Sequence, residues 1–411
     1  MLKIYVCGPT VYNEAHIGNL RPILTFDLIL KGYRFLDEKF IFVHNITDID
    51  DKIINRAIEQ NKNELEISKF YEEKYFECLK KLNVDTISYV ERVTNNMELI
   101  TNYINKIFLS KNAYKDIDGN IWFDVKKNSQ NYGLVSNQNL NKMIFEEENK
   151  NKKFEADFAL WKKTNKGIQF QSLFGPGRPG WHTECCALID KHFGQNGVDI
   201  HGGGMDLTFP HHENENIQHF ALYSKHLAKK WIRTGQINLD GIKMSKSLGN
   251  TISISEFLEK NSPDLLKLII LNSKLTAPIN ITDEWIDYIK SIEDKYQKLI
   301  FKFFITFDLN EFKNIEKNNE QKQIFESLKN CDFSQYNFLL NEQIKSFNKT
   351  QNINFAKNIY QVLNIIHPDI TNEYRYKDAL TKFHQWRLFI DKKDYKKADI
   401  IRDELIKNKF Y

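Results

Sequence analysis

The order of apolar segments in the first sixty residues constrains the fold most strongly. Residues 3–8 have the composition of a buried strand, residues 19–35 carry apolar side chains at helical spacing, and residues 40–46 form a second apolar strand. An acidic stretch at residues 47–52 leads into another helical pattern. Alternating strands and helices at this spacing predict an α/β fold with a parallel sheet, which binds ligands at the carboxyl ends of its strands.

Length, charge and cysteine content limit the class of protein. A chain of 411 residues has room for about two to three domains. Its formal net charge of +4 neither demonstrates nor excludes a nucleic-acid partner. No apolar run reaches the roughly 20 residues of a membrane span, and the early first strand leaves no room for a signal peptide. Because five cysteines in so long a chain do not form a disulfide framework, we expect a cytoplasmic protein.

The pattern changes twice along the rest of the chain. Residues 91–170 are less regular and contain a hairpin signal at Gly119-Asn120 before the apolar run 121–125, which predicts an inserted subdomain. The Gly-rich region 175–212 is expected to return to strands and loops. Beyond Ser253 the pattern is almost entirely helical, with Lys-rich faces.

Four side chains that can bind a metal lie in separate polar clusters. Cys7 follows the first strand, and Cys185 ends a Gly-Trp-His-Thr-Glu-Cys run. His211 and Glu215 follow Pro210, which suits the start of a helix, so they fall on one helical face at positions i and i+4. Two thiolates, one imidazole and one carboxylate suit zinc. The residues alone leave open the commoner alternative, that distant cysteines and a His-rich helix start are unrelated.

Two further clusters are typical of phosphate binding. His16-Ile17-Gly18-Asn19 stands at the start of a helical pattern, and Lys243-Met244-Ser245-Lys246-Ser247 gathers two lysines and two hydroxyls in one loop. Such a Lys-Ser run alone is usually a solvated turn, but the two clusters together favour a nucleotide site. His201 precedes Gly202-Gly203-Gly204-Met205-Asp206, where the backbone can approach a ligand closely. The alternative there is a tight turn with a solvent-facing Asp206.

Together these motifs resemble those of the cysteinyl-tRNA synthetases, a family of class I aminoacyl-tRNA synthetases. The matching segments occur in the family's order at residues 5–12, 16–19, 45–52, 177–185, 201–204, 211–215, 243–247 and 398–405. The resemblance implies a Rossmann-type parallel-sheet catalytic domain with an inserted connective subdomain, followed by a C-terminal α-helical anticodon-binding domain. The implied segments are the first half of the catalytic domain at 1–90, the insertion at 91–170, the second half with the zinc site and lysine loop at 171–250, a stem-contact region at 251–285 and the anticodon-binding domain at 286–411.

The resemblance also implies residue roles. The family's zinc-ligand positions are occupied by Cys7, Cys185, His211 and Glu215. The family's ATP-binding and catalytic positions are occupied by His16, Gly18, Asn19, Lys243 and Lys246. Positions that line the amino-acid pocket and the adenylate site are occupied by Thr47, Trp181, His201 and Asp206.

The reaction that the resemblance implies is the activation of L-cysteine with Mg²⁺-bound ATP, followed by transfer of cysteine to the terminal adenosine of tRNA(Cys). One zinc ion binds the substrate thiolate, and serine loses that interaction, so selection needs no editing site. The family is commonly monomeric. The chain starts almost at its first strand and stops soon after residues 398–405. We therefore expect either a compact member or one with a shortened C-terminus and fewer anticodon contacts.

Two alternatives remain at this point. A cysteine ligase can keep the same zinc and ATP sites and acylate an amino sugar, but such relatives lack a full helical anticodon domain, whereas the helical pattern here continues to residue 411. A non-catalytic nucleotide- or RNA-binding protein descended from a synthetase is the second alternative. It is disfavoured because all four ligand positions and both nucleotide signatures are intact.

Overall fold

The computed structural model describes residues 1–145, 150–244, 249–408 and 410. The chain folds as two compact units, which are treated separately below. The first unit comprises Met1–Ile23, Lys39–Lys80 and Val84–Gln236, and the second comprises Leu24–Glu38, Lys81–Asn83 and Ile237–Tyr411. The finer domain boundaries expected from the sequence remain predictions.

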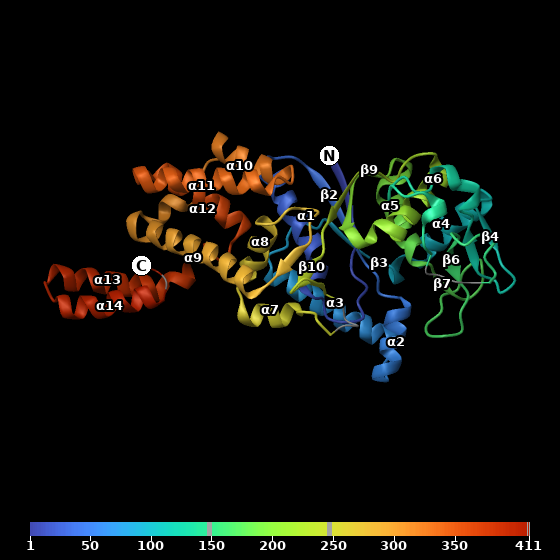
Figure 1. The fold of residues 1–411 in the computed structure, drawn as a ribbon, viewed down its shortest axis with the longest axis horizontal. Coiled ribbons are helices and arrows are strands. Elements are labelled where there is room, and N and C mark those ends of the chain that lie inside the picture. The colour runs from blue at the N-terminus through green and yellow to red at the C-terminus, as the bar shows by residue number, and fades with distance from the viewer. Residues whose placement is uncertain (146–149, 245–248, 409, 411) are drawn as a thin grey trace. The chain divides into compact units, whose positions relative to one another are not determined.

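A five-stranded parallel sheet is the centre of the first unit (Figure 1). Its strands are β1 (Leu2–Val6), β2 (Phe40–Ile46), β3 (Tyr89–Arg92), β8 (Val198–Gly204) and β9 (Ala228–Thr234). They lie in the order β3-β2-β1-β8-β9, and all neighbouring pairs are parallel. The order reverses between β1 and β8, so a ligand-binding crevice is expected at the carboxyl ends of these two strands. The predicted α/β class is therefore confirmed.

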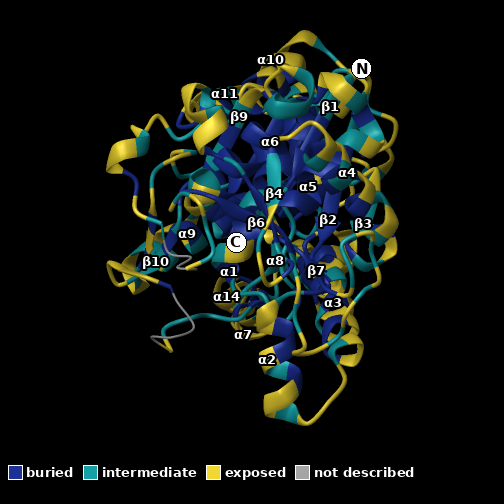
Figure 2. Cartoon of the chain, turned by 90° about the vertical axis from the view of Figure 1, so that its right-hand side faces the viewer, coloured by how far each residue is buried: buried dark blue, intermediate teal, exposed yellow. Residues whose placement is uncertain are grey.

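The first strands are apolar because the sheet is covered on both faces, as a parallel sheet requires. Tyr5, Val6 and Val43 are buried in the core, as the dark strands of Figure 2 show. The helices of this unit are the start of α1 (Ile17–Phe35), α2 (Asp51–Gln60), α3 (Glu64–Lys81), α4 (Met97–Leu109), α5 (Trp181–Phe193) and α6 (Glu213–Tyr223). The bounds of β2 match the predicted strand, and α1 starts two residues before the predicted helix.

One expectation about this unit is only partly right. Residues 175–212 were expected to form strands and loops, and β8 lies among them, but α5 occupies thirteen of these residues. Glycines at both ends of this segment suggested an extended chain. Within it, however, the apolar and small side chains of Cys185, Cys186, Ala187, Leu188 and Ile189 are all buried, and a helix packs them against the core.

A second sheet of the first unit is antiparallel. Its strands are β4 (Ala113–Lys115), β5 (Ile121–Phe123), β6 (Phe158–Lys162) and β7 (Arg178–Pro179), in that order. The first three lie within the insertion predicted at residues 91–170, and β7 lies beyond it. The predicted hairpin is present, because β4 pairs antiparallel with β5 and Gly119 takes a φ of 94° in the turn. Trp122 and Phe123 of β5 are buried, which explains the short apolar run seen in the sequence.

The second unit is mainly helical. A small sheet of β10 (Ile237–Leu239), β11 (Ile242–Lys243) and β12 (Ile279–Ile281) precedes most of its helices. These helices are α7 (Ile254–Lys260), α8 (Pro263–Leu271), α9 (Asp283–Thr306), α10 (Asn319–Lys329), α11 (Phe333–Thr350), α12 (Ile353–Ile366), α13 (Lys377–Asp391) and α14 (Tyr395–Lys407). The predicted helical C-terminal region is therefore confirmed.

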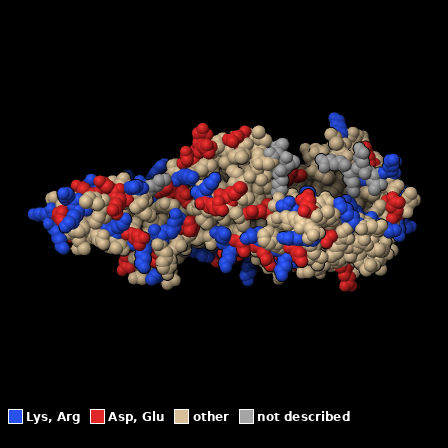
Figure 3. All heavy atoms as spheres, turned by 90° about the horizontal axis from the view of Figure 1, so that it is seen from below, with Lys and Arg blue, Asp and Glu red and all other residues tan. Residues whose placement is uncertain are grey.

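The surface of the last helices mixes both charges. Basic and acidic side chains alternate over α13 and α14, at the left of Figure 3. Lys382 and Glu404 form a 2.7 Å ion pair between the two helices. Within the described part of the chain, no helix combines the length and the apolar character needed to cross a membrane.

Candidate active site

The loop after β1 brings Cys7 to the point where the strand order reverses. The Cys7 N–H donates to the Gly202 carbonyl of β8 at 3.1 Å, and the next N–H, of Gly8, donates to Asn45 Oδ1 at 2.8 Å. Gly8 permits this approach, because a Cβ there would lie 1.6 Å from the Asn45 carbonyl oxygen. The glycine after the first strand thus lets the loop lie directly against the end of β2.

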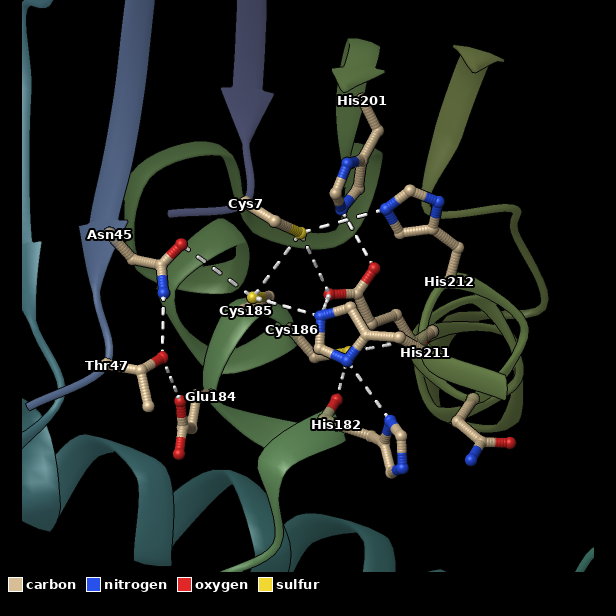
Figure 4. Close-up of polar contacts among 12 residues, drawn as sticks. Cys7, Asn45, Thr47, His182, Glu184, Cys185, Cys186, His201, His211 and His212 are labelled. Atoms are coloured by element: carbon tan, nitrogen blue, oxygen red, sulfur yellow. Dashed lines mark hydrogen bonds and ion pairs between the residues drawn. The ribbon is translucent and has the colours of Figure 1, made fainter. Parts of the chain in front are cut away.

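Four predicted metal ligands meet beside this loop (Figure 4). The sulfurs of Cys7 and Cys185 are 3.9 Å apart, and Cys7 Sγ is 3.7 Å from Glu215 Oε1. His211 Nε2 lies 3.8 Å from Cys185 Sγ and 3.0 Å from Glu215 Oε1. Two sulfurs bound to one tetrahedral zinc are about 3.8 Å apart, given zinc–sulfur bonds of about 2.3 Å. The donor set and its spacing therefore fit a zinc ion.

The helical spacing predicted for His211 and Glu215 explains their contact. Helix α6 begins at Glu213, and His212 before it already has helical dihedral angles. His211 and Glu215 are therefore one turn apart, as expected from the sequence. Both side chains are buried, as is Cys185, whereas Cys7 is half-buried.

A second, overlapping group consists of Cys7, His201, His212 and Glu215. The hydrogen bonds argue against it as a ligand set. Arg233 Nε donates to His212 Nδ1 at 3.3 Å, so the other ring nitrogen of neutral His212 carries the hydrogen and faces Cys7 Sγ at 3.8 Å. A protonated nitrogen donates a hydrogen bond and does not bind a metal. His212 is thus a donor to the sulfur of Cys7.

Two further histidines contact predicted metal ligands: His201 contacts Glu215, and His182 contacts His211. His201 Nε2 lies 2.9 Å from Glu215 Oε2, which leaves Oε1 directed toward His211. His182 Nδ1 lies 3.1 Å from His211 Nδ1, on the side of the ring away from the sulfurs. Such outer partners fix the orientation of metal-binding side chains.

The electrostatics of the quartet favour a cation. Although burial opposes ionisation of Glu215, the charges of His211 and His201 lower the pKa of its carboxyl well below the usual value. Burial also disfavours a charged His211, but Glu215 and Cys185 raise the pKa of its ring to about 10. Burial and the neighbouring Cys185 raise the pKa of Cys7. Glu215 and His211 thus form a buried ion pair, and binding of a metal ion to His211 would release the proton of its ring.

The predicted pocket residues differ in exposure. Trp181 is 39% exposed and stacks on His211, with ring centroids 4.2 Å apart, and Asp206 is also exposed. Thr47 and His201 are buried beside the metal ligands. The structure thus brings Thr47, Trp181 and His201 close to the quartet, and their role in substrate binding remains a prediction.

The first nucleotide signature lies at the start of α1. Asn19 N–H donates to the His16 carbonyl at 2.9 Å, and His16 N–H donates to Asn19 Oδ1 at 3.3 Å. Gly18 is half-buried and Asn19 is exposed at this helix start, where free N–H groups favour anions. In the second unit, Lys243 is exposed at the end of β11. Lys246 lies outside the described residues.

Several residues of the site were not singled out from the sequence. Asn45, His182, Glu184 and His212 lie within the recognised motifs, but their contacts with the ligand segments depend on the fold. Arg233 lies on β9 in a stretch without any motif. Only the pairing of β8 with β9 places it beside His212.

Comparisons with known proteins agree with this geometry. The family described as "tRNA synthetases class I (C) catalytic domain" matches residues 1–291. A cysteine–tRNA ligase of Mesomycoplasma hyopneumoniae is 41% identical over 99% of this chain and 97% of its own length. The cysteine–tRNA ligase of Mycoplasmoides gallisepticum is 40% identical, over 99% and 95% of the two chains.

A solved structure shows the same fold at low sequence identity. The Mycobacterium tuberculosis methionyl-tRNA synthetase in complex with methionyl-adenylate is 12% identical, with a TM-score of 0.65 over 90% of this chain and 92% of that chain. The likeness concerns the fold alone. Because the family match covers more than half of the sequence and the two ligases match along nearly all of it, the chain belongs to the cysteine–tRNA ligase family of class I tRNA synthetases and is an enzyme of the ligase class.

Proposed function

We propose that this enzyme activates L-cysteine with ATP to cysteinyl-adenylate, releases pyrophosphate, and transfers cysteine to the 3′-terminal adenosine of tRNA(Cys). The observation that carries the proposal is the quartet of Cys7, Cys185, His211 and Glu215, whose donor set suits a substrate that itself carries a thiol. The names of the two relatives support tRNA as the acceptor over the amino sugar considered from the sequence.

A zinc ion in the quartet would supply a Lewis acid that takes the substrate thiolate as a further ligand and discriminates against the hydroxyl of serine. Around it, His201 contacts Glu215 at ion-pair distance, and His212 donates a hydrogen bond to Cys7. Trp181 stacks on His211 and keeps an exposed face, so we propose that it covers the side chain of the bound amino acid. A site of this kind can reject serine without an editing step.

The nucleotide signatures would provide positioning and charge stabilisation. We propose that His16, Gly18 and Asn19 at the start of α1 bind the phosphates of Mg²⁺-bound ATP. Lys243 and Lys246 would neutralise the charge that develops on pyrophosphate as it leaves. No side chain of the enzyme needs to act as a nucleophile, because the cysteine carboxylate itself attacks the α-phosphorus.

The remaining predicted roles are part of the same proposal. Thr47, His201 and Asp206 would complete the amino-acid pocket and the adenylate site. Residues 286–411 would bind the anticodon, and the enzyme would act as a monomer. A cytoplasmic location agrees with the five cysteines, none of which forms a disulfide bond within the described residues.

Two assays test this function. Pyrophosphate exchange is expected with cysteine and not with serine, because only cysteine offers a thiolate. Transcripts of tRNA(Cys) with intact and altered anticodons are then charged, and the intact form is expected to accept cysteine more efficiently. Adenylate formation without charging of any tRNA would contradict the tRNA acceptor and favour the amino-sugar alternative. Equal charging of both transcripts would contradict anticodon binding by residues 286–411.

A further inference from the structure

A chain of hydrogen bonds runs behind the two cysteines of the quartet, from the Cys7 loop to α5. Gly8 N–H donates to Asn45 Oδ1 at 2.8 Å, Asn45 Nδ2 donates to Thr47 Oγ1 at 3.3 Å, and Thr47 Oγ1 donates to Glu184 Oε2 at 2.9 Å. Figure 4 shows Thr47 between Asn45 and Glu184, with Cys185 beside them.

The two residues at the ends of this series of hydrogen bonds are sequence neighbours of two predicted metal ligands. Gly8 follows Cys7, and Glu184 precedes Cys185 on α5. The two residues in the middle of this series of hydrogen bonds, Asn45 and Thr47, lie at the end of β2. Because β2 is held on one side by β1 and on the other by β3, it is a rigid reference for both cysteines.

The backbone of Thr47 adds to this connection. Thr47 N–H donates to the Pro9 carbonyl, and Val11 N–H donates to the Thr47 carbonyl, each at 3.1 Å. The Cys7 loop is therefore held along its length by backbone bonds, whereas the end of β2 contacts the start of α5 through side chains, of which the Thr47 hydroxyl makes the shorter bond. Asn45 Oδ1 also lies 4.0 Å from Cys185 Sγ.

Burial indicates what this chain of bonds can do. Asn45 is 1% exposed, and Thr47 and Glu184 are each 2% exposed. Polar groups so deeply buried are stable only while their hydrogen bonds are made. Asn45, Thr47 and Glu184 therefore keep the same hydrogen-bond partners in the folded protein. By doing so they hold the Cys7 loop and the start of α5 in position relative to β2.

We propose that Asn45, Thr47 and Glu184 are positioning residues of the metal centre: through Gly8 and the first turn of α5 they set the separation of the Cys7 and Cys185 sulfurs. The inference rests on the proposed zinc site. Outer partners of this kind commonly change metal affinity by about 10- to 100-fold when they are removed. These three residues thus influence the affinity for zinc, in addition to any contact that Thr47 makes with the substrate.

The test compares Thr47→Val with Thr47→Ser in the full-length enzyme. Valine keeps the shape and removes the hydroxyl, whereas serine keeps the hydroxyl. The zinc dissociation constant is measured by competition with a chromophoric chelator, and the Co²⁺-substituted enzymes are compared by their visible absorption. We expect Thr47→Val to weaken zinc binding about 10- to 100-fold and to alter the Co²⁺ bands, and Thr47→Ser to stay within about twofold of wild type.

Glu184→Met breaks the same bond from its other end and replaces Thr47→Val if that variant does not fold. It should also weaken zinc binding, and the double variant should be no weaker than Thr47→Val alone, because Thr47→Val already removes the bond that Glu184→Met breaks. Wild-type zinc affinity and Co²⁺ bands in Thr47→Val or Glu184→Met would overturn the inference. Failure of the zinc proposal itself is recognised separately, as wild-type enzyme that activates cysteine without bound zinc.

Discussion

His201 Nε2 lies 2.9 Å from Glu215 Oε2, on the carboxylate oxygen that does not face His211. The two oxygens of Glu215 therefore contact different histidines, since Oε1 is 3.0 Å from His211 Nε2. His201 therefore orients a predicted metal ligand without belonging to the quartet. The contacts of the site lead to four expected outcomes.

Replacing His201 by Ala should weaken the proposed metal centre, because Glu215 Oε2 loses the imidazole that it contacts at 2.9 Å. We expect zinc affinity to fall about 10- to 100-fold, measured by chelator competition. His384→Ala, on an exposed position of α13, serves as the control and should leave zinc affinity unchanged. Unchanged affinity in His201→Ala would mean that Glu215 is oriented by its other contacts.

Cys185→Ser and Cys186→Ser form a matched pair of adjacent substitutions. Cys185 belongs to the quartet, whereas Cys186 Sγ donates to the Glu215 carbonyl at 3.2 Å, a role that a hydroxyl can also fill. Cys185→Ser should abolish tight zinc binding and cysteine-dependent pyrophosphate exchange, and Cys186→Ser should retain both. Exchange at the wild-type rate after removal of zinc would contradict the proposed role of the metal.

Gly8→Ala should displace the Cys7 loop, because the new Cβ would meet the Asn45 carbonyl oxygen at 1.6 Å. Relief of this overlap requires a backbone shift, with an expected cost of about 2 kcal/mol or more. Thermal unfolding measures the destabilisation, and zinc content measures the loss of Cys7 from its position. A variant with wild-type melting temperature and zinc content would show that the loop tolerates another path.

The stability of the first unit should depend on pH through His44. Its Nδ1 lies 3.0 Å from the Val6 carbonyl and its Nε2 2.9 Å from the Tyr75 hydroxyl. Burial lowers the pKa of His44 to about 4. Between this value and the unfolded pKa of about 6.5, only the unfolded chain is protonated at this position, so stability falls as the pH falls.

His44→Asn isolates this contribution from those of the other buried histidines. Between pH 7.5 and pH 5, His44 should account for about 2 kcal/mol of lost stability. Urea unfolding followed by tryptophan fluorescence at the two pH values measures the difference. The loss should be smaller in His44→Asn by about that amount, and an identical loss in both proteins would show that His44 is protonated in the folded state.

The sequence could predict the parts of the fold that local patterns determine. The strand at Phe40–Ile46 and the helix of α1 follow from apolar periodicity, and the spacing of His211 and Glu215 follows from helix geometry. The family resemblance then named all four members of the quartet. Helix α5 was missed because its first residue follows a Gly-rich segment and because residues 183–189 are all buried, which obscures the helical periodicity.

The outer contacts of the site could not be predicted in this way. Arg233 meets His212 only because β9 pairs with β8, and Glu184 meets Thr47 only because α5 packs beside the end of β2. Such contacts join segments that are far apart in the sequence, as the separation of 137 residues between Thr47 and Glu184 shows. A single sequence contains no local signal for them.

The distribution of the quartet over β1, α5 and α6 also has a consequence during synthesis of the chain. Glu215 follows Cys7 by 208 residues, so the ribosome adds the last ligand about 10 to 40 s after the first, at about 5 to 20 residues per second. Until then Cys7 has no partner that could complete a metal site. Uptake of the proposed zinc ion would therefore follow assembly of these three elements, and the ion could not guide the earliest steps of folding.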